Sequence, residues 1–288
     1  MVPSIPKVGI LPNNMRLGFA PGDIPLADLV WPLGAPPGVE DGRLRDLGPD
    51  DHLIVSPRKT VHLRPGFGTR ARVSILVMEP AAIHGAHLRA LRWTYRRFFR
   101  VLTCNEDLLG AIPNGIFFAH GDTWVSEWRD LEVSKTRMCS LIASTKRSQE
   151  GHRLRHAVAG WAGAEGRDVD LLGWGYRKFG AKAEGLAPYR YSVVIENVRE
   201  RNYFTEKIID AVLCETVPIY WGCPNIGDFL DTDGMILCRD EREIRAAIEA
   251  MSPADYAARR PALVAQKARA AHWGDTLRRA AEAVLDAR

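Results

Sequence analysis

The feature that most constrains this fold is a regular alternation of short apolar runs with longer amphipathic stretches. Ten runs have the length and composition of buried strands. They are residues 8–11, 52–56, 72–78, 98–104, 115–119, 139–144, 169–173, 191–196, 217–221 and 235–238. Apolar residues recur at helical spacing in residues 83–97, 151–163, 205–215, 240–251 and 254–286. Strands that alternate with helices predict a mainly parallel sheet, covered by helices on both faces.

The number of strands indicates more than one domain. Ten strands are too many for one compact sheet in a chain of 288 residues. We expect two Rossmann-like domains, with a hinge near residues 125–137, where the apolar periodicity lapses. The expected division is an N-terminal domain over residues 1–130 and a second domain over 131–265. A C-terminal helix over residues 266–288, broken near Gly274, could pack back on the first domain.

Composition and charge exclude several classes of protein. With 46% hydrophobic and 26% charged residues, the chain is too apolar to be disordered. A net charge of +4 is too small to indicate general nucleic-acid binding. No signal peptide and no long apolar window occur, so we expect a cytoplasmic protein without a transmembrane segment. The basic side of the last helix leaves two alternatives open, a solvated face or a peripheral contact with the inner membrane.

Motifs for metals and for nicotinamide cofactors are weak. Residues 168–170 and 231–233 both read Asp-x-Asp and could share a hard cation, but this pattern is common by chance. His152 and His156 would share a helix face without a third ligand. The string Gly-Trp-Gly at residues 173–175 follows a strand but lacks the rest of a dinucleotide fingerprint. We therefore expect no metal and no resident cofactor.

The most informative segment is residues 186–224, LAPYRYSVVIENVRERNYFTEKIIDAVLCETVPIYWGCP. A buried strand ends there in polar residues, and after a loop Thr205 stands where a helix N-cap belongs. Glu206 and Lys207 occupy the first helical turn. Open α/β sheets bind ligands at such strand ends, and helix N-termini favour phosphate. A lysine opposes the helix dipole in a first turn, which suggests that Lys207 meets an anion.

This segment resembles the family-ten α-1,3/1,4-fucosyltransferases, and closely the bacterial members. YRYSVVIEN is similar to the family strand Y-K-F/Y-S-L/V-x-F/I-E-N, and NYFTEKIIDAVLCETVPIYWG is similar to the stretch that follows it. Weaker likeness extends over roughly residues 72–250. The resemblance implies an α/β GT-B fold, with two Rossmann-like domains facing across a cleft. It also implies an inverting transfer of L-fucose from a GDP-fucose donor, bound by the C-terminal half, to a hydroxyl of a glycan acceptor.

The resemblance assigns the role of general base to Glu79. This residue closes an apolar strand and would take the proton from the acceptor hydroxyl during its attack on the sugar. The family often has Gly-Glu-Asn where this chain has Met-Glu-Pro. A helix N-cap or a strand-end carboxylate is the alternative for Glu79.

The resemblance also assigns residues to the donor site. Arg155 and Lys207 would contact the donor phosphates, as guanidinium and ammonium groups do. Arg153, Lys146 and Arg147 compete with Arg155 for this role.

The remaining donor-site residues flank the same helix. Glu206 would accept hydrogen bonds from the ribose hydroxyls, and Asn197 and Tyr203 resemble further donor-site residues. Tyr203 could instead only pack the loop. Glu196 could either bind the donor or brace Asn197.

Two other functions stay open. The same fold and mechanism could serve a different nucleotide-sugar donor, because the motif matches nucleotide and phosphates better than the sugar ring. A non-catalytic homologue that binds a nucleotide or a glycan is the second alternative. For transfer of fucose or of another sugar, two cations and helix N–H groups could substitute for a metal. This favours a metal-independent displacement.

Overall fold

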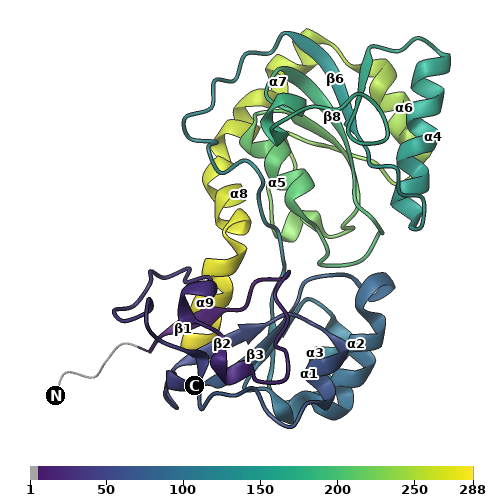
Figure 1. The fold of residues 1–288 in the computed structure, drawn as a ribbon. Helices are drawn as coiled ribbons and strands as arrows, with labels where there is room; N and C mark the ends of the chain where they lie inside the picture. Colours follow the sequence, from purple (N-terminus) through teal and green to yellow (C-terminus); the bar gives the residue numbers. More distant parts are fainter. Residues whose placement is uncertain (1–5, 288) are drawn as a thin grey trace. The chain divides into compact units, whose positions relative to one another are not determined.

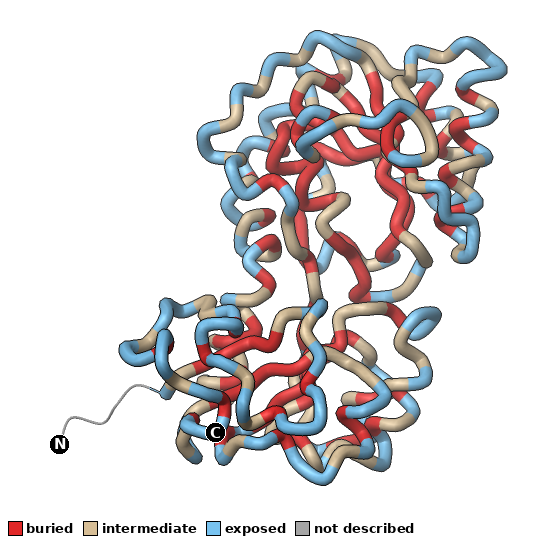
Figure 2. The backbone as a smooth tube through the Cα atoms, viewed as in Figure 1, coloured by how far each residue is buried: buried red, intermediate tan, exposed pale blue. Residues whose placement is uncertain are grey.

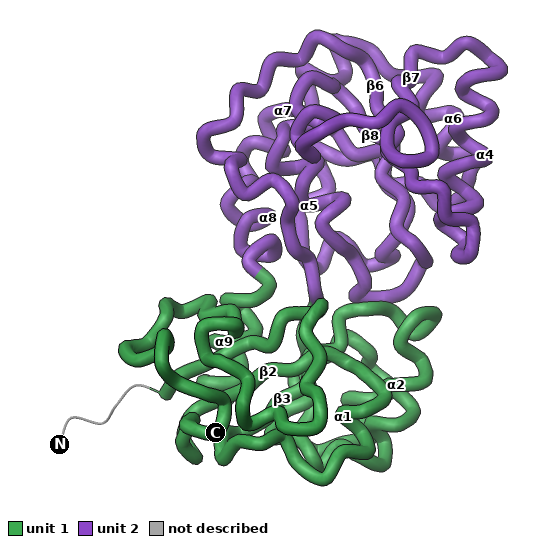
Figure 3. The backbone as a smooth tube through the Cα atoms, in the orientation of Figure 1, with its two compact units in different colours: residues 1–119, 276–288 green, residues 120–275 purple. Residues whose placement is uncertain are grey.

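The computed structural model describes residues 6–287, which form two compact units. The first unit contains the chain up to Ala119 and again from Thr276, and the second contains His120–Asp275 (Figure 3). The sequence placed the boundary after residue 130 and began a separate C-terminal helix at residue 266. The structure instead assigns residues 120–130 and 266–275 to the second unit.

Specific polar and backbone contacts hold the segment after Ala119 to the second unit. Asp210, in helix α5 (Glu206–Leu213), accepts hydrogen bonds from Thr123 Oγ1 at 2.7 Å and from the Trp124 N–H at 3.0 Å. Gly121 has a φ of 79°, and a Cβ there would lie 2.2 Å from the carbonyl oxygen of Trp273. Because isolated contacts rather than an apolar stripe fix this segment, its sequence shows no periodicity that could place the boundary.

The first unit contains a parallel sheet in the order β1-β2-β3-β4-β5. Its strands are β1 (Val8–Ile10), β2 (His52–Val55), β3 (Arg72–Val77), β4 (Val101–Thr103) and β5 (Gly115–Phe117). Its helices are α1 (Lys59–Leu63), α2 (Ala81–Thr94), α3 (Glu106–Leu109) and α9 (Thr276–Asp286) (Figure 1). All five strands coincide with predicted apolar runs. The sequence missed α1 and α3, which are too short to show helical periodicity.

Alternation along the strands gives this sheet two apolar faces. Leu53 and Val55 of β2 belong to one buried cluster, together with Leu91 of α2. Ile54, which lies between them, belongs to a second cluster with Val284 of α9. Since successive side chains of a strand point to opposite faces, α2 and α9 cover opposite faces of the sheet. The apolar side of the last helix is therefore used in packing.

The second unit contains another parallel sheet, in the order β10-β9-β8-β6-β7. Its strands are β6 (Arg137–Ile142), β7 (Val169–Leu172), β8 (Tyr189–Ile195), β9 (Val217–Trp221) and β10 (Ile236–Leu237). Its helices are α4 (Glu150–Ala164), α5, α6 (Glu241–Ala250), α7 (Pro253–Ala265) and α8 (Lys267–Gly274). Strand β9 is buried throughout. Figure 2 shows buried segments in the interior of each unit and exposed segments at its surface. The chain adds β7 on one side of β6 and the later strands on the other, so the strand order reverses beside β6.

The C-terminal helical stretch predicted over residues 254–286 is three helices. α7 ends before Gln266, and α8 ends at Gly274, where the sequence predicted a break. No helix among residues 6–287 is long and apolar enough to cross a membrane.

Candidate functional site

A cavity of about 560 Å³ opens in the second unit, at the carboxyl ends of β6 and β8. Ser144 follows β6 and Asn197 follows β8, and both line it. The volume lies within the range of roughly 300–1,000 Å³ that is usual for small-molecule sites. Because the strand order reverses here, the cavity occupies the position where open α/β sheets bind ligands.

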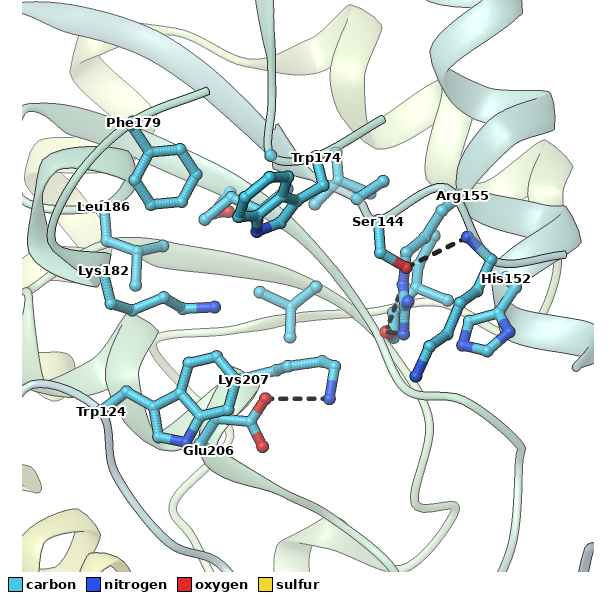
Figure 4. Close-up of a pocket in the computed structure, with 18 of the residues that line it drawn as sticks. Trp124, Ser144, His152, Arg155, Trp174, Phe179, Lys182, Leu186, Glu206 and Lys207 are labelled. Carbon is cyan, nitrogen blue, oxygen red and sulfur yellow. Dashed lines mark hydrogen bonds and ion pairs between the residues drawn. The ribbon is translucent and has the colours of Figure 1, made fainter. Parts of the chain in front are cut away.

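Positive charge dominates the lining of this cavity. Five of its residues are cations: Lys146, Arg155, Lys178, Lys182 and Lys207. Figure 4 labels three of them, Arg155, Lys182 and Lys207. Among the described residues that line it, Glu206 carries the single carboxylate. The N-terminus of α5 adds the positive end of a helix dipole. The cavity therefore suits a ligand with several negative charges.

The start of α5 is held by a buried carboxylate. Glu196 accepts hydrogen bonds from the Thr205 N–H at 2.9 Å and from Thr205 Oγ1 at 2.8 Å. Thr205 caps the helix, because its hydroxyl oxygen accepts from the Lys207 N–H. This confirms the predicted N-cap. Glu196 is fully buried and is not part of the cavity lining, so its contacts brace Thr205 rather than Asn197.

Glu206 and Lys207 form an ion pair at the cavity wall. Lys207 Nζ lies 3.1 Å from Glu206 Oε1 and 3.5 Å from Glu196 Oε2, and it donates to Thr205 Oγ1 at 2.9 Å. Burial opposes ionisation of Glu206, but the charges of Lys207 and Lys182 outweigh it and lower the pKa of the carboxyl. Burial likewise opposes the charge on Lys207, but Glu196 and Glu206 raise the pKa of its ammonium group. Both groups are therefore charged at neutral pH.

Arg155 joins α4 to the end of β8. Its Nε donates to the Ile195 carbonyl at 2.9 Å, and its Nη2 donates to Asn197 Oδ1 at 3.0 Å. Burial lowers the pKa of this guanidinium, although Glu196 and Glu206 oppose the shift. Arg155 thus orients Asn197 and brings a positive charge to the cavity wall. Of its competitors, Lys146 also lines the cavity, whereas Arg153 and Arg147 do not.

Besides Glu196, two predicted residues lie outside the cavity lining. Tyr203 is 1% exposed and lies in the core of the second unit. Glu79 is half-buried in the first unit, between β3 and α2. The N-cap position of α2 belongs to Pro80, so the alternative of Glu79 as an N-cap does not apply.

The structure adds aromatic residues that sequence reasoning missed. Trp124, Trp174 and Phe179 line the cavity, and the two tryptophans are 64% and 75% exposed. Lys178 Nζ lies 4.5 Å from the centroid of the Trp174 ring, and Lys182 Nζ lies 5.5 Å from the centroid of the Trp124 ring. Exposed indole rings offer flat apolar faces on which a nucleobase can stack.

The Gly-Trp-Gly string at residues 173–175 is the sequence feature that could have identified Trp174 as a residue of the cavity lining. A Cβ at Gly173 would lie 2.4 Å from the Ala143 carbonyl oxygen, and one at Gly175 would lie 2.9 Å from that of Ser144. Gly173 also has a φ of 100°. The two glycines let the loop lie against the end of β6, which places Trp174 at the cavity. The string lacks the rest of a dinucleotide fingerprint, but it still marks a residue of the cavity lining.

A matched pair of glycines tests the close approach of α4 to β8. A Cβ at Gly151 would lie 1.7 Å from the backbone oxygen of Glu196, whereas nothing lies within 4 Å of one at Gly160. Gly151→Ala is expected to destabilise the protein by about 3 kcal/mol or more. Gly160→Ala, in the same helix, is expected to stabilise it by roughly 0.5–1 kcal/mol. Urea unfolding measures both, and equal effects would contradict this packing.

Asp210 predicts a pH dependence of stability. Burial raises the pKa of its carboxyl to about 7, although Lys182 and the hydrogen bonds from Thr123 and Trp124 oppose the shift. Its Oδ2 has no hydrogen-bond partner among the described residues. In the unfolded chain the carboxyl has an ordinary aspartate pKa of about 3.9. The folded state therefore binds the proton more tightly. The stabilisation from Asp210 is complete below about pH 4 and disappears as the pH rises to 7.

Asp210→Asn should remove that contribution. We expect the unfolding free energy of the variant to fall less steeply between pH 4 and 7, by at most about 1.4 kcal/mol per pH unit. Urea titrations across this range measure the slope. Asp233→Asn, at an exposed carboxylate, should keep the parental slope. An unchanged slope in Asp210→Asn would show that Asp210 titrates normally.

No family model matches the chain. It is 35% identical over 68 residues to an alpha-(1,3)-fucosyltransferase of Helicobacter pylori, a match that covers 24% of this chain and 14% of that protein. It is 40% identical over 48 residues to a fucosyltransferase-like protein of Arabidopsis thaliana, covering 17% of this chain and 9% of that one. These matches span only a small part of the relatives' own length.

The fold shows a likeness to a solved enzyme. The chain aligns with a crystal structure of an alpha1,3-fucosyltransferase at a TM-score of 0.50 and 15% identity, covering 73% of this chain and 69% of that one. With two parallel-sheet α/β domains, the chain has the GT-B fold of glycosyltransferases, which confirms the predicted fold class. More particularly, the two relatives in sequence given above are an alpha-(1,3)-fucosyltransferase and a fucosyltransferase-like protein.

Proposed function

We propose that this chain is an inverting glycosyltransferase of the family-ten type, which moves L-fucose from GDP-fucose to a hydroxyl of a glycan acceptor. The observation that carries the proposal is the cavity of the second unit. There the capped N-terminus of α5, the Glu206–Lys207 ion pair and Arg155 line the same space as two exposed tryptophans. The stretch that contains this helix is also the one that resembles fucosyltransferases.

In this proposal the nucleotide uses each part of the cavity. The diphosphate binds Lys207, Arg155 and the N–H groups at the start of α5, which together offer charge and directed donors. The carboxylate of Glu206, kept ionised by Lys207, accepts hydrogen bonds from the ribose hydroxyls. Asn197 contributes a further polar contact, and the base stacks on an exposed indole ring. Tyr203 and Glu196 support these groups from the core.

The chemical step is a direct displacement. The acceptor oxygen attacks the anomeric carbon of fucose and gives its proton to Glu79 as the new bond forms. The bond from the anomeric carbon to the β-phosphate oxygen breaks, and GDP leaves with the electron pair, so the configuration inverts. Lys207 and Arg155 stabilise the charge that develops on the leaving phosphate. In other transferases a metal ion stabilises this charge. Here the two fixed cations do so, and the proposed reaction is therefore metal-independent.

The test is a comparison of nucleotide sugars. We expect GDP to bind and GDP-fucose to be turned over, measured as GDP release in the presence of a mixture of glycan acceptors. If GDP binds but another GDP-sugar is turned over instead, the mechanism stands with a different donor. If GDP binds and no sugar is turned over, the chain is a non-catalytic binder. If no GDP-sugar and no GDP bind, the proposal fails.

A further inference from the structure

The positive charge of this chain is concentrated in one stretch. Residues 52–105 contain ten Lys and Arg side chains and one acidic side chain, Glu79. This stretch therefore carries +9, whereas the entire chain carries +4. The remaining residues have a net charge of −5. Such an asymmetry within a chain of modest net charge indicates a local anionic partner.

Part of that charge forms a stripe on α2 and its continuation. Arg89, Arg92, Trp93 and Arg96 are exposed and follow the i, i+3, i+4, i+7 spacing of one helix face. Leu91 and its neighbours on the other side of the helix are buried in the core of the first unit. The indole of Trp93 is 87% exposed. The stripe is thus an outward face that does not pack into the core of this unit.

The arginines of the stripe are not neutralised by the protein. Arg89, Arg92 and Arg96 form no ion pair among residues 6–287. Arg92 donates instead to the backbone oxygen of Asp107 at 3.4 Å, and Arg96 donates to the hydroxyl of Tyr95 at 3.1 Å. Like charges at i, i+3 and i+4 destabilise a helix by a few tenths of a kcal/mol per pair. An external anion would relieve this repulsion.

An exposed aliphatic side chain lies on α1, which contacts the residues directly after Trp93. Leu63, at the end of α1, is 83% exposed. Its neighbour His62 is 3.0 Å from the Thr94 hydroxyl, directly after Trp93, and Arg97 donates to the backbone oxygen of Arg64. These contacts hold the ends of α1 and α2 together. The basic-apolar face is defined here as Leu63, Arg89, Arg92, Trp93 and Arg96.

We propose that the basic-apolar face binds the surface of an anionic phospholipid membrane. Arginines bind lipid phosphates, and tryptophan settles at the boundary between headgroups and acyl chains. An exposed leucine side chain is buried favourably at that boundary. It has no flat face on which a nucleobase could stack. This combination favours a bilayer over a nucleic acid.

The C-terminal helix α9 is less suited to a membrane contact than the basic-apolar face. In α9, Ala280, Ala281 and Val284 are buried against the sheet of the first unit. That helix has no free apolar side to insert, so its basic residues alone would face a membrane. The basic-apolar face offers both charge and exposed apolar side chains, which is the combination that peripheral membrane binding needs.

Sedimentation with vesicles tests the proposal on the full chain. We expect binding to vesicles of phosphatidylcholine mixed with phosphatidylglycerol, weakening as salt is added, and little binding to phosphatidylcholine alone. The triple variant Arg89→Glu, Arg92→Glu, Arg96→Glu should lower the partition coefficient at least about tenfold, since each basic residue contributes substantially at such a surface. Trp93→Ala with Leu63→Ala should lower it several-fold at every salt concentration.

The matched control carries the same charge change on the second unit. Arg153→Glu, Arg242→Glu, Arg269→Glu replaces three exposed arginines of that unit and should retain binding within about twofold. Thermal unfolding of every variant shows that it is folded, independently of any transferase activity. Equal losses in both triple variants would mean that net charge alone drives binding, and would overturn the proposal. Absence of vesicle binding by the parental chain, or binding to single-stranded RNA without binding to vesicles, would overturn it as well.

Discussion

Replacing Glu79 with glutamine is expected to lower the rate constant of sugar transfer by about 10²–10⁴-fold, the usual contribution of a general base. Glutamine keeps the size and polarity of the side chain but cannot take the acceptor proton. The affinity for GDP should not change, because every described residue that lines the cavity of the second unit belongs to that unit, whereas Glu79 belongs to the first. Single-turnover rates with GDP-fucose, together with GDP titrations, measure the two effects separately.

Asp107→Asn is the matched control for Glu79→Gln. Asp107 is exposed on α3, which follows the neighbouring strand β4 in the same sheet. It should transfer sugar at nearly the parental rate. If Glu79→Gln also kept the parental rate, the general base would have to be another group, and the assignment by resemblance would be wrong.

The strands of this fold could be predicted because buried strands have a locally apolar sequence. Each of the ten observed strands coincides with an apolar run, since strands of a parallel sheet are covered on both faces and need continuous apolar side chains. The short helices α1 and α3 could not be predicted, because one turn shows no period. The predicted helix over residues 254–286 is three helices. The sequence predicted the break at Gly274, but it did not predict the end of α7 before Gln266, which depends on tertiary packing.

The cavity lining was predictable where its residues lie in one stretch of sequence. Asn197, Glu206 and Lys207 come from a strand and the helix after it, so their proximity follows from the topology. Arg155 could be predicted only from the resemblance. Trp124 could not be predicted, because it reaches the cavity through hydrogen bonds of its backbone and of Thr123 to a buried aspartate, far away in the sequence.

Removing the Lys207 ammonium group should weaken GDP binding by at least about 100-fold. In Lys207→Ala the diphosphate would lose a buried, charge-assisted contact, which is among the stronger polar interactions in proteins. The variant should also be less stable by about 3–5 kcal/mol, because the fully buried Glu196 would lose the cation that lies 3.5 Å from it. GDP titration calorimetry and urea unfolding measure these two losses.

A second substitution separates the two effects of Lys207→Ala. Adding Glu196→Gln removes the uncompensated negative charge but retains an oxygen that can accept from Thr205, so much of the lost stability should return. GDP affinity should stay low in the double variant, since the cation is still missing. Lys135→Met controls for loss of a buried lysine away from the cavity. Its ammonium group donates to the Cys214 carbonyl at 2.7 Å, so the variant should be destabilised yet bind GDP normally. If the double variant regained GDP affinity together with stability, Lys207 would act only by neutralising Glu196, and the phosphates would have to bind other cations.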